Sequence, residues 1–248
     1  MSPQGFDEFY TRTFSKVLSV AIMASGSRFE AEDAVQDGYL AALRRWDQVG
    51  GYERPEAWVL KVALRRLWRS RRRRRREDQP LELTVPPQAT PDETAHAREV
   101  LGALASLPAD ARIAIVTCAV LGWTQAELAE VLNVPRNTIG NRIFRGRAML
   151  RARLGLVGQL PGERDALVAA PRLAAQFAVP DDDPVDAMLM RAERWLRAGL
   201  EAEPETAEWI REQVARQAAA ASGRQWRHPW RAIGRWTAGR TRGGQHGG

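Results

Sequence analysis

The chain has 248 residues, of which 44% are hydrophobic, a formal net charge of +7 at pH 7 and one cysteine. This length and apolar content are enough for more than one packed core. A single cysteine excludes an internal disulfide and a cysteine-rich metal site, so we expect Cys118 to have a packing role. The acidic, aromatic N-terminus does not resemble a secretory signal, and no apolar run is long enough to span a membrane. We therefore expect a cytoplasmic protein.

The positive charge lies in two blocks, residues 1–76 and 100–155, and the segment between them is acidic. Two basic units joined by a Pro-rich acidic linker indicate two contacts with one polyanion, for which nucleic acid is the natural candidate. The composition predicts four parts: residues 1–76, a linker over 77–94, a second unit over 95–155 and an extension over 156–248.

Two helices are predicted at the start of the first block. Residues 5–24 carry apolar side chains at helical spacing, and Ser25-Gly26-Ser27 ends the pattern. Residues 31–46 form the second helix, and residues 47–55 form a loop. Polar side chains gather near the start of the second helix, where they either favour the helix dipole or contact a partner. They are Glu32, Asp33, Gln36 and Asp37.

The third predicted helix begins after Pro55, covers residues 56–76 and is strongly basic. It ends in an unbroken arginine run over 71–76, which repels itself unless an anion such as phosphate screens it. Trp68 is a candidate for stacking on a base, whereas Trp58 fits a core position better. The alternative interpretation is a solvated, frayed helix end. The basic side chains interleaved with the apolar ones are Lys61, Arg65, Arg66 and Arg69.

A helix-turn-helix is predicted over residues 123–154, preceded by helices over 92–105 and 108–121. Thr124 with Glu127 forms a capping-box pattern, so the first helix of the motif begins at Gln125. Asn133-Val134-Pro135 is a tight connection to the second helix. The expected apolar side of the second helix consists of Ile139, Ile143, Met149 and Leu150.

The other side of this second helix suits the major groove of DNA. Arginine and asparagine make bidentate hydrogen bonds to guanine and adenine, threonine contacts the thymine methyl group, and further arginines hold phosphates. Gly140 lowers helix stability by about 1 kcal/mol relative to alanine. The alternative interpretation is a solvated helical hairpin. The candidate DNA-binding residues are Arg136, Asn137, Thr138, Asn141, Arg142 and Arg145.

The ordered set of these segments resembles a bacterial sigma factor of the sigma-70 family, of the group-four, extracytoplasmic-function (ECF) type. Residues 31–46 are similar to region 2.2, residues 55–76 to regions 2.3 and 2.4, and residues 104–154 to region 4. The resemblance covers residues 5–154. It implies an all-α fold with two small helical DNA-binding domains, and a protein that directs core RNA polymerase to promoters without cofactor, metal or catalytic residues of its own.

The resemblance also implies roles for particular residues. Asp33, Gln36 and Asp37 would contact the clamp helices of the polymerase β′ subunit, and the loop over 48–55 would capture a flipped base of the −10 element. Lys61, Arg65, Arg66 and Arg69 would read and stabilise the melted strand. The second helix of the motif would read the −35 element, while its domain binds the polymerase β flap. Arg65 and Gly140-Asn141 depart from the residues common in the family, which indicates an unusual promoter preference.

Residues 156–248 exceed what a minimal factor of this type needs. Helices are predicted around 163–179, 184–200 and 204–221, followed by a tail that places Trp226, Trp230 and Trp236 among arginines. Such a tail suits a membrane surface, nucleic acid or a protein groove, and the alternative is a disordered tail. We expect the extension to regulate activity in cis, by folding back on the DNA-binding domains or by receiving a partner. An anti-sigma factor is a further candidate partner.

Two other classes of protein are alternatives to a sigma factor: a stand-alone regulator and an enzyme. A stand-alone helix-turn-helix regulator with an N-terminal helical sensor domain would bind duplex DNA without polymerase. An enzyme is disfavoured, because His96, His228 and His246 are scattered and no phosphate loop, metal-ligand spacing or nucleophile motif occurs.

Overall fold

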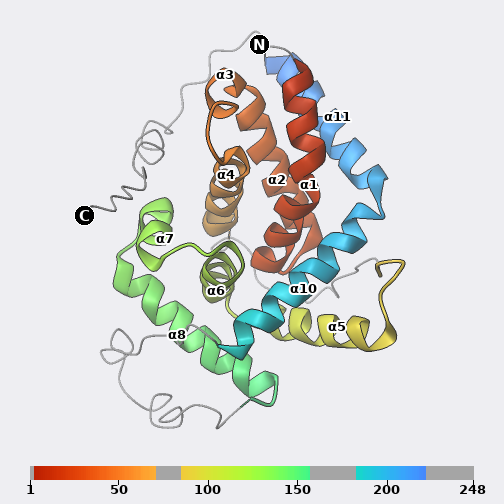
Figure 1. The fold of residues 1–248 in the computed structure, drawn as a ribbon. Helices are drawn as coiled ribbons and strands as arrows, with labels where there is room; N and C mark the ends of the chain where they lie inside the picture. Colours follow the sequence, from red (N-terminus) through yellow and green to blue (C-terminus); the bar gives the residue numbers. More distant parts are fainter. Residues whose placement is uncertain (1–2, 71–84, 157–182, 222–248) are drawn as a thin grey trace, which may run out of the picture.

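The structure, a computed structural model, describes residues 3–70, 85–156 and 183–221 (Figure 1). Every regular element in these ranges is an α-helix, as the all-α prediction requires. The helices form three groups: an N-terminal unit over residues 3–70, a helix-turn-helix unit over residues 91–153 and a C-terminal pair over residues 184–221. No helix in the described ranges has the length and apolar character needed to cross a membrane.

The N-terminal unit is built around the aromatic side of α1 (Pro3–Ser25). Tyr10 packs against Tyr39 of α2 (Arg28–Leu43), with ring centroids 4.6 Å apart, and Phe9 packs against Trp46 at 4.9 Å. These side chains stack through tilted and edge contacts, which add to the free energy of burying their area. The aromatic stripe predicted over residues 5–24 therefore is the core side of α1.

The second predicted helix differs from the observed one at both ends. The Ser27 hydroxyl accepts a hydrogen bond from the Glu30 amide, so α2 begins three residues earlier than expected. α2 ends at Leu43, and Trp46 belongs to a short helix, α3 (Trp46–Val49), inside the segment predicted as loop. The prediction missed this break because apolar spacing continues through it to Trp46.

α4 (Pro55–Ser70) packs closely on α2, and Pro55 opens it as predicted. A Cβ atom at Gly38 would lie 3.0 Å from the Val59 carbonyl oxygen, so only glycine permits this approach of the two helices. The arginine run over 71–76 lies outside the described residues.

The helix-turn-helix unit has the predicted order of helices. It comprises α5 (Pro91–Ala105), α6 (Ala109–Leu121), α7 (Gln125–Leu132) and α8 (Arg136–Arg153). Thr124 and Glu127 form the predicted capping box, and Asn133 adopts a left-handed conformation (φ 53°) that ends α7. Ile139, Ile143 and Leu150 are buried, but Met149 is exposed and its assignment to the apolar side was wrong, since it lies about 120° around the helix from Ile143.

The helix-turn-helix unit packs against the N-terminal unit through α6 and α1. Arg112 of α6 is 7% exposed and donates hydrogen bonds to the carbonyl oxygens of Ala24 and Ser25 at the end of α1. It also donates to the carbonyls of Ala105 and Leu107 in the α5–α6 connection. One guanidinium group thereby satisfies carbonyls that both helix ends leave without an intrahelical partner.

The C-terminal pair consists of α10 (Pro184–Glu201) and α11 (Pro204–Ala221), as predicted from the apolar spacing. α10 contacts α1, α5, α6 and α8, whereas α11 contacts α1 and α2 (Figure 1). The third predicted helix of the extension, over 163–179, and the basic tail with Trp226, Trp230 and Trp236 lie outside the described residues.

Candidate nucleic-acid interface

The outer side of α8 carries the exposed part of the predicted DNA-binding set. Arg136, Asn137 and Arg145 are exposed, and Thr138 and Asn141 are partly buried. Asn137, Asn141 and Arg145 recur at helical spacing, so they share the side of α8 that faces away from Ile139 and Ile143. This surface can present hydrogen-bond donors and acceptors to base edges and positive charge to phosphates.

Arg142 of α8 is already engaged within the protein. Its Nε atom lies 2.8 Å from Oδ2 of Asp110, and its guanidinium carbon lies 4.6 Å from the ring centroid of Trp68 in α4. The second contact is a cation–π interaction between the two units. Arg142 therefore does not belong to the freely exposed surface of α8 to which the sequence pattern assigned it.

Two of the basic residues of α4 face the helix-turn-helix unit. Lys61 is 6% exposed, and Arg65 donates a hydrogen bond from Nε to the carbonyl oxygen of Val131 in α7, at 2.5 Å. Desolvation and the neighbouring charge of Arg65 lower the pKa of Lys61, and Glu130 partly offsets them. Desolvation also lowers the pKa of Arg65. Both cations are thus held where a nearby anion would stabilise their charged forms.

The tryptophans of α4 are packed inside the protein. Trp58 is 8% exposed, as expected for a core residue, and Trp68 is 6% exposed beneath Arg142. The candidate stacking surface of Trp68 is therefore covered in this conformation. Arg69, by contrast, is exposed.

Arg66 of α4 faces α2, away from α7. It forms ion pairs with Asp37 and, at 3.4 Å, with Asp33, so it joins a candidate DNA-binding residue to two candidate polymerase-binding ones. Burial raises the pKa of Asp37, and the charge of Arg66 opposes that shift. Asp33, Gln36 and Asp37 are each partly exposed along one side of α2. The structure brings them together as a polar surface that solvent reaches.

The segment predicted to capture a flipped base is shorter and more ordered than a simple loop. α3 ends at Val49, and the chain then turns through Gly50 and Gly51 to Pro55. Glu53 and Arg54 are exposed there, and Arg54 lies 3.5 Å from Glu56.

Two structurally important residues were not singled out by the sequence pattern. Arg112 lies in a mostly apolar helix, and its carbonyl partners cannot be read from composition. Asp183 is 3% exposed and binds Arg147 and Arg151 of α8, the latter at 2.8 Å. Its place directly before Pro184 is a helix-start signal, and its side chain accepts the Val185 amide, but the partners come from another helix.

Cys118 is partly buried, and burial raises its pKa to about 12, as expected for an unreactive packing residue. Across the described residues, no cluster of three or more histidine, cysteine or acidic side chains is arranged to hold a metal ion.

Comparison with known proteins matches two parts of the chain to sequence families. Sigma-70 region 2 matches residues 9–77 and Sigma-70 region 4 matches residues 97–150. The ECF RNA polymerase sigma factor EcfG of Rhodopseudomonas palustris is 33% identical over 56% of this chain and 78% of its own. SigL of Mycobacterium tuberculosis is 30% identical over 56% of this chain and 82% of its own, and SigM of the same species is 29% identical over 60% and 77%. No solved structure matches the chain.

Proposed function

Because the chain belongs to the ECF RNA polymerase sigma factors of the sigma-70 family, we propose that it binds core RNA polymerase and directs it to promoters through their −10 and −35 elements. The observation that carries this proposal is the presence of region 2 followed by region 4 in one chain. A stand-alone regulator with an N-terminal sensor domain accounts for the helix-turn-helix but not for the match of residues 9–77 to Sigma-70 region 2. The reaction itself belongs to the polymerase, in the cytoplasm.

For the −35 element, we infer that α8 enters the major groove with Arg136, Asn137 and Arg145 leading, and with Thr138 and Asn141 beside them. The exposure of Arg136 at the start of α8, and of Asn137 and Arg145 along its outer side, supports this role. Arg142 would contact DNA only after its ion pair with Asp110 breaks.

For the −10 element, Lys61, Arg65, Arg66 and Arg69 of α4 would hold the melted strand. The gathering of these four cations on one helix supports this role, because strand phosphates bind positively charged side chains. Trp68 would then be available for stacking, which offsets part of the free energy of unstacking bases.

For the polymerase, Asp33, Gln36 and Asp37 would dock on the β′ clamp helices, and the helix-turn-helix unit on the β flap. The partial exposure of the three α2 side chains is consistent with docking. An anti-sigma factor would be a further regulator.

Transcription reconstituted from core polymerase and the full chain tests this function. We expect initiation at discrete promoters, mapped from the transcripts, and a reduction of at least about fivefold for Asn137→Ala, since a bidentate base contact contributes about 1–3 kcal/mol. Arg98→Ala, an exposed position on α5, is the matched control and should leave initiation unchanged. Duplex binding without any promoter-directed initiation by core polymerase would instead indicate a stand-alone regulator.

A further inference from the structure

α10 lies where it can hold the two DNA-binding units together. Val185, Leu189, Leu196 and Leu200 form its buried side, and it contacts α1 of the N-terminal unit as well as α5, α6 and α8 of the helix-turn-helix unit. In Figure 1, α10 (cyan) runs from beside α8 to the start of α11. Separating the two units would expose this apolar side to water, so α10 favours their association.

The first end of α10 is bound to α8 by buried ion pairs. Asp183 accepts hydrogen bonds from Arg147 and Arg151, and Asp186 lies 2.6 Å from a second Arg147 nitrogen. Arg147 and Arg151 are 7% and 5% exposed. Charged groups this deeply buried need their partners, so removing the Asp183 carboxylate charge should loosen this end strongly.

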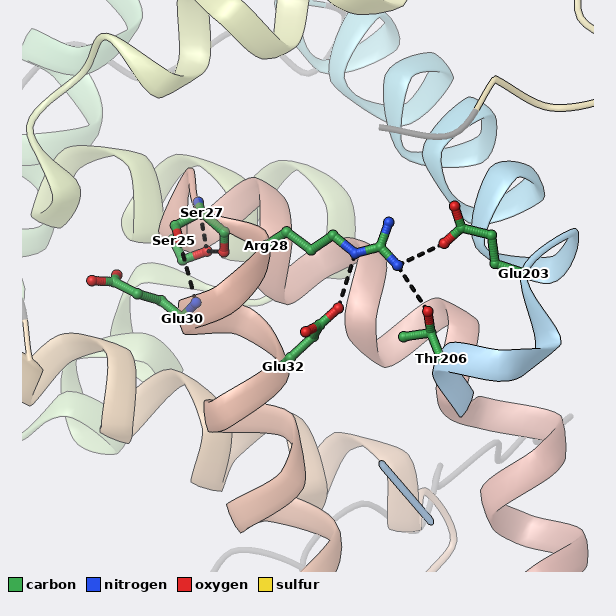
Figure 2. Close-up of polar contacts among 7 residues, drawn as sticks. All are labelled: Ser25, Ser27, Arg28, Glu30, Glu32, Glu203 and Thr206. Atoms are coloured by element: carbon green, nitrogen blue, oxygen red, sulfur yellow. Dashed lines mark hydrogen bonds and ion pairs between the residues drawn. The ribbon is translucent and has the colours of Figure 1, made fainter. Parts of the chain in front are cut away.

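The other end of the C-terminal pair is bound to α2. Arg28 contacts Glu203 at 2.6 Å and Thr206 at 2.9 Å while its Nε holds Glu32 of its own helix, as Figure 2 shows. The Tyr10 hydroxyl of α1 donates to the Ala207 carbonyl of α11 at 2.8 Å. The C-terminal pair is thus bound at one end to the helix-turn-helix unit and at the other to the N-terminal unit.

The association that results covers one proposed DNA-binding surface and leaves others open. Lys61, Arg65 and Trp68 of α4 lie against α7 and α8. The Val131 carbonyl accepts the Arg65 hydrogen bond that a phosphate oxygen could accept, and Arg142 lies over the Trp68 ring, where a base could stack. Arg136, Asn137 and Arg145 of α8 remain exposed, and so in part do the acidic residues of α2.

We propose that α10 and α11 form an intramolecular latch that keeps the helix-turn-helix unit over the strand-binding side of α4, so that the free chain binds single-stranded DNA more weakly than a chain whose latch is open. The ligand of the covered surface is a single nucleic-acid strand, and this identification rests on the proposed function. Opening the latch exposes Lys61, Arg65 and Trp68 together, whereas the exposed surface of the outer side of α8 increases little.

The test compares latch variants of the full chain in the absence of polymerase. Asp183→Asn and Glu203→Gln, singly and together, weaken the two ends, and Glu212→Gln is the matched control because it removes only an exposed pair with Arg216 inside α11. The probes are a mixed-sequence single strand of about 20 nucleotides, longer than one strand-binding site, and its duplex. Affinity is measured by fluorescence anisotropy over a salt series, and opening by amide hydrogen exchange in α10.

In the double variant we expect faster exchange in α10 and about tenfold tighter binding of the single strand, since the binding-competent fraction rises. The salt dependence should steepen because at least two further cations contact phosphate. Duplex affinity should change by less than about threefold, because the outer side of α8 is already exposed.

Faster exchange with unchanged single-strand affinity would overturn the latch, and so would unchanged exchange in the double variant. Equal gains in affinity for the single strand and the duplex would show that the loss of negative charge alone strengthens binding, and would also overturn the latch. If Asp183→Asn fails to fold, Glu203→Gln, at a partly exposed position, carries the test by itself. Failure of the sigma function would appear separately, as absence of promoter-directed initiation with core polymerase.

Discussion

The two helices proposed to read DNA differ in how much of their polar surface the protein itself uses. On α8, Arg136, Asn137 and Arg145 are exposed, whereas on α4 Lys61 is buried and Arg65 is bonded to a carbonyl of α7. Both helices look alike in sequence, as basic stripes beside apolar ones. A basic stripe therefore indicates what a surface can bind, while the contacts of the folded chain decide whether that surface is free to bind it.

The groups that cover α4 are chemically similar to those a DNA strand would bring. The Val131 carbonyl accepts from Arg65 as a phosphate oxygen would, and Arg142 lies over the Trp68 ring as a base would stack on it. The closed arrangement therefore satisfies side chains that would otherwise lose hydration without compensation. In the proposed function, a nucleic-acid strand would have to displace Val131 and Arg142 from these side chains before binding them.

Replacing Arg112 should have the largest effect on this arrangement. Arg112→Ala leaves buried carbonyls of Ala24, Ser25, Ala105 and Leu107 without their donor. An unsatisfied buried group is destabilising by about 1–3 kcal/mol, and water can replace some of the lost bonds, so we expect the free energy of unfolding to fall by about 3–5 kcal/mol. Urea denaturation followed by circular dichroism measures it.

The control for this prediction is Arg98→Ala at an exposed position of the same unit, which should change the free energy of unfolding by less than about 0.5 kcal/mol. Arg112→Lys should recover only part of the loss, because an ammonium group cannot match the fork of a guanidinium. Equal stability of Arg112→Ala and the control would mean that Arg112 does not join α6 to α1.

The sequence predicted the helices and the local signals that start them, because these depend on neighbouring residues. Capping at Thr124, Pro55 at a helix start and the aromatic side of α1 are all read from short spacings. The engagement of Arg65 and Arg142 could not be predicted, since their partners, Val131 and Trp68, lie more than 60 residues away in the chain. The spacing of basic residues along a helix does not specify which distant surface packs on that helix.

Acidification should weaken the contact between α8 and α10. Burial opposes the charged form of Asp183, but hydrogen bonds from Arg151 and the Val185 amide and the charge of Arg147 outweigh it, so its pKa lies below the ordinary value. The folded state then binds the proton less tightly than the unfolded state. The stability from this carboxylate is present above the ordinary aspartate pKa and is lost as the pH falls through the lowered pKa.

The measurement is the difference in unfolding free energy between the native chain and Asp183→Asn across a pH series. Near neutral pH we expect the native chain to be more stable than the variant by about 3 kcal/mol, as for loss of one partner in a buried ion pair. This difference should shrink below about pH 4. Glu212→Gln, in an exposed pair, should show a difference near zero throughout. A difference for Asp183→Asn that does not depend on pH would mean that its charge does not hold α10 to α8.

The smallest effect is expected for α8, the helix on which Arg136, Asn137 and Arg145 are exposed. A Cβ at Gly140 would meet only the end of the flexible Gln125 side chain, at 3.0 Å, so Gly140→Ala should raise the free energy of unfolding by about 0.5–1 kcal/mol through helix propensity. Gly146→Ala is the matched control on the same helix. There a Cβ would lie 2.6 Å from Ile115 and 3.1 Å from Ala111, and overpacking should destabilise by about 1–3 kcal/mol. Duplex affinity of Gly140→Ala should stay unchanged, because Asn137 and Arg145 keep their exposure; a loss of affinity at equal or higher stability would show that DNA approaches α8 closely at Gly140.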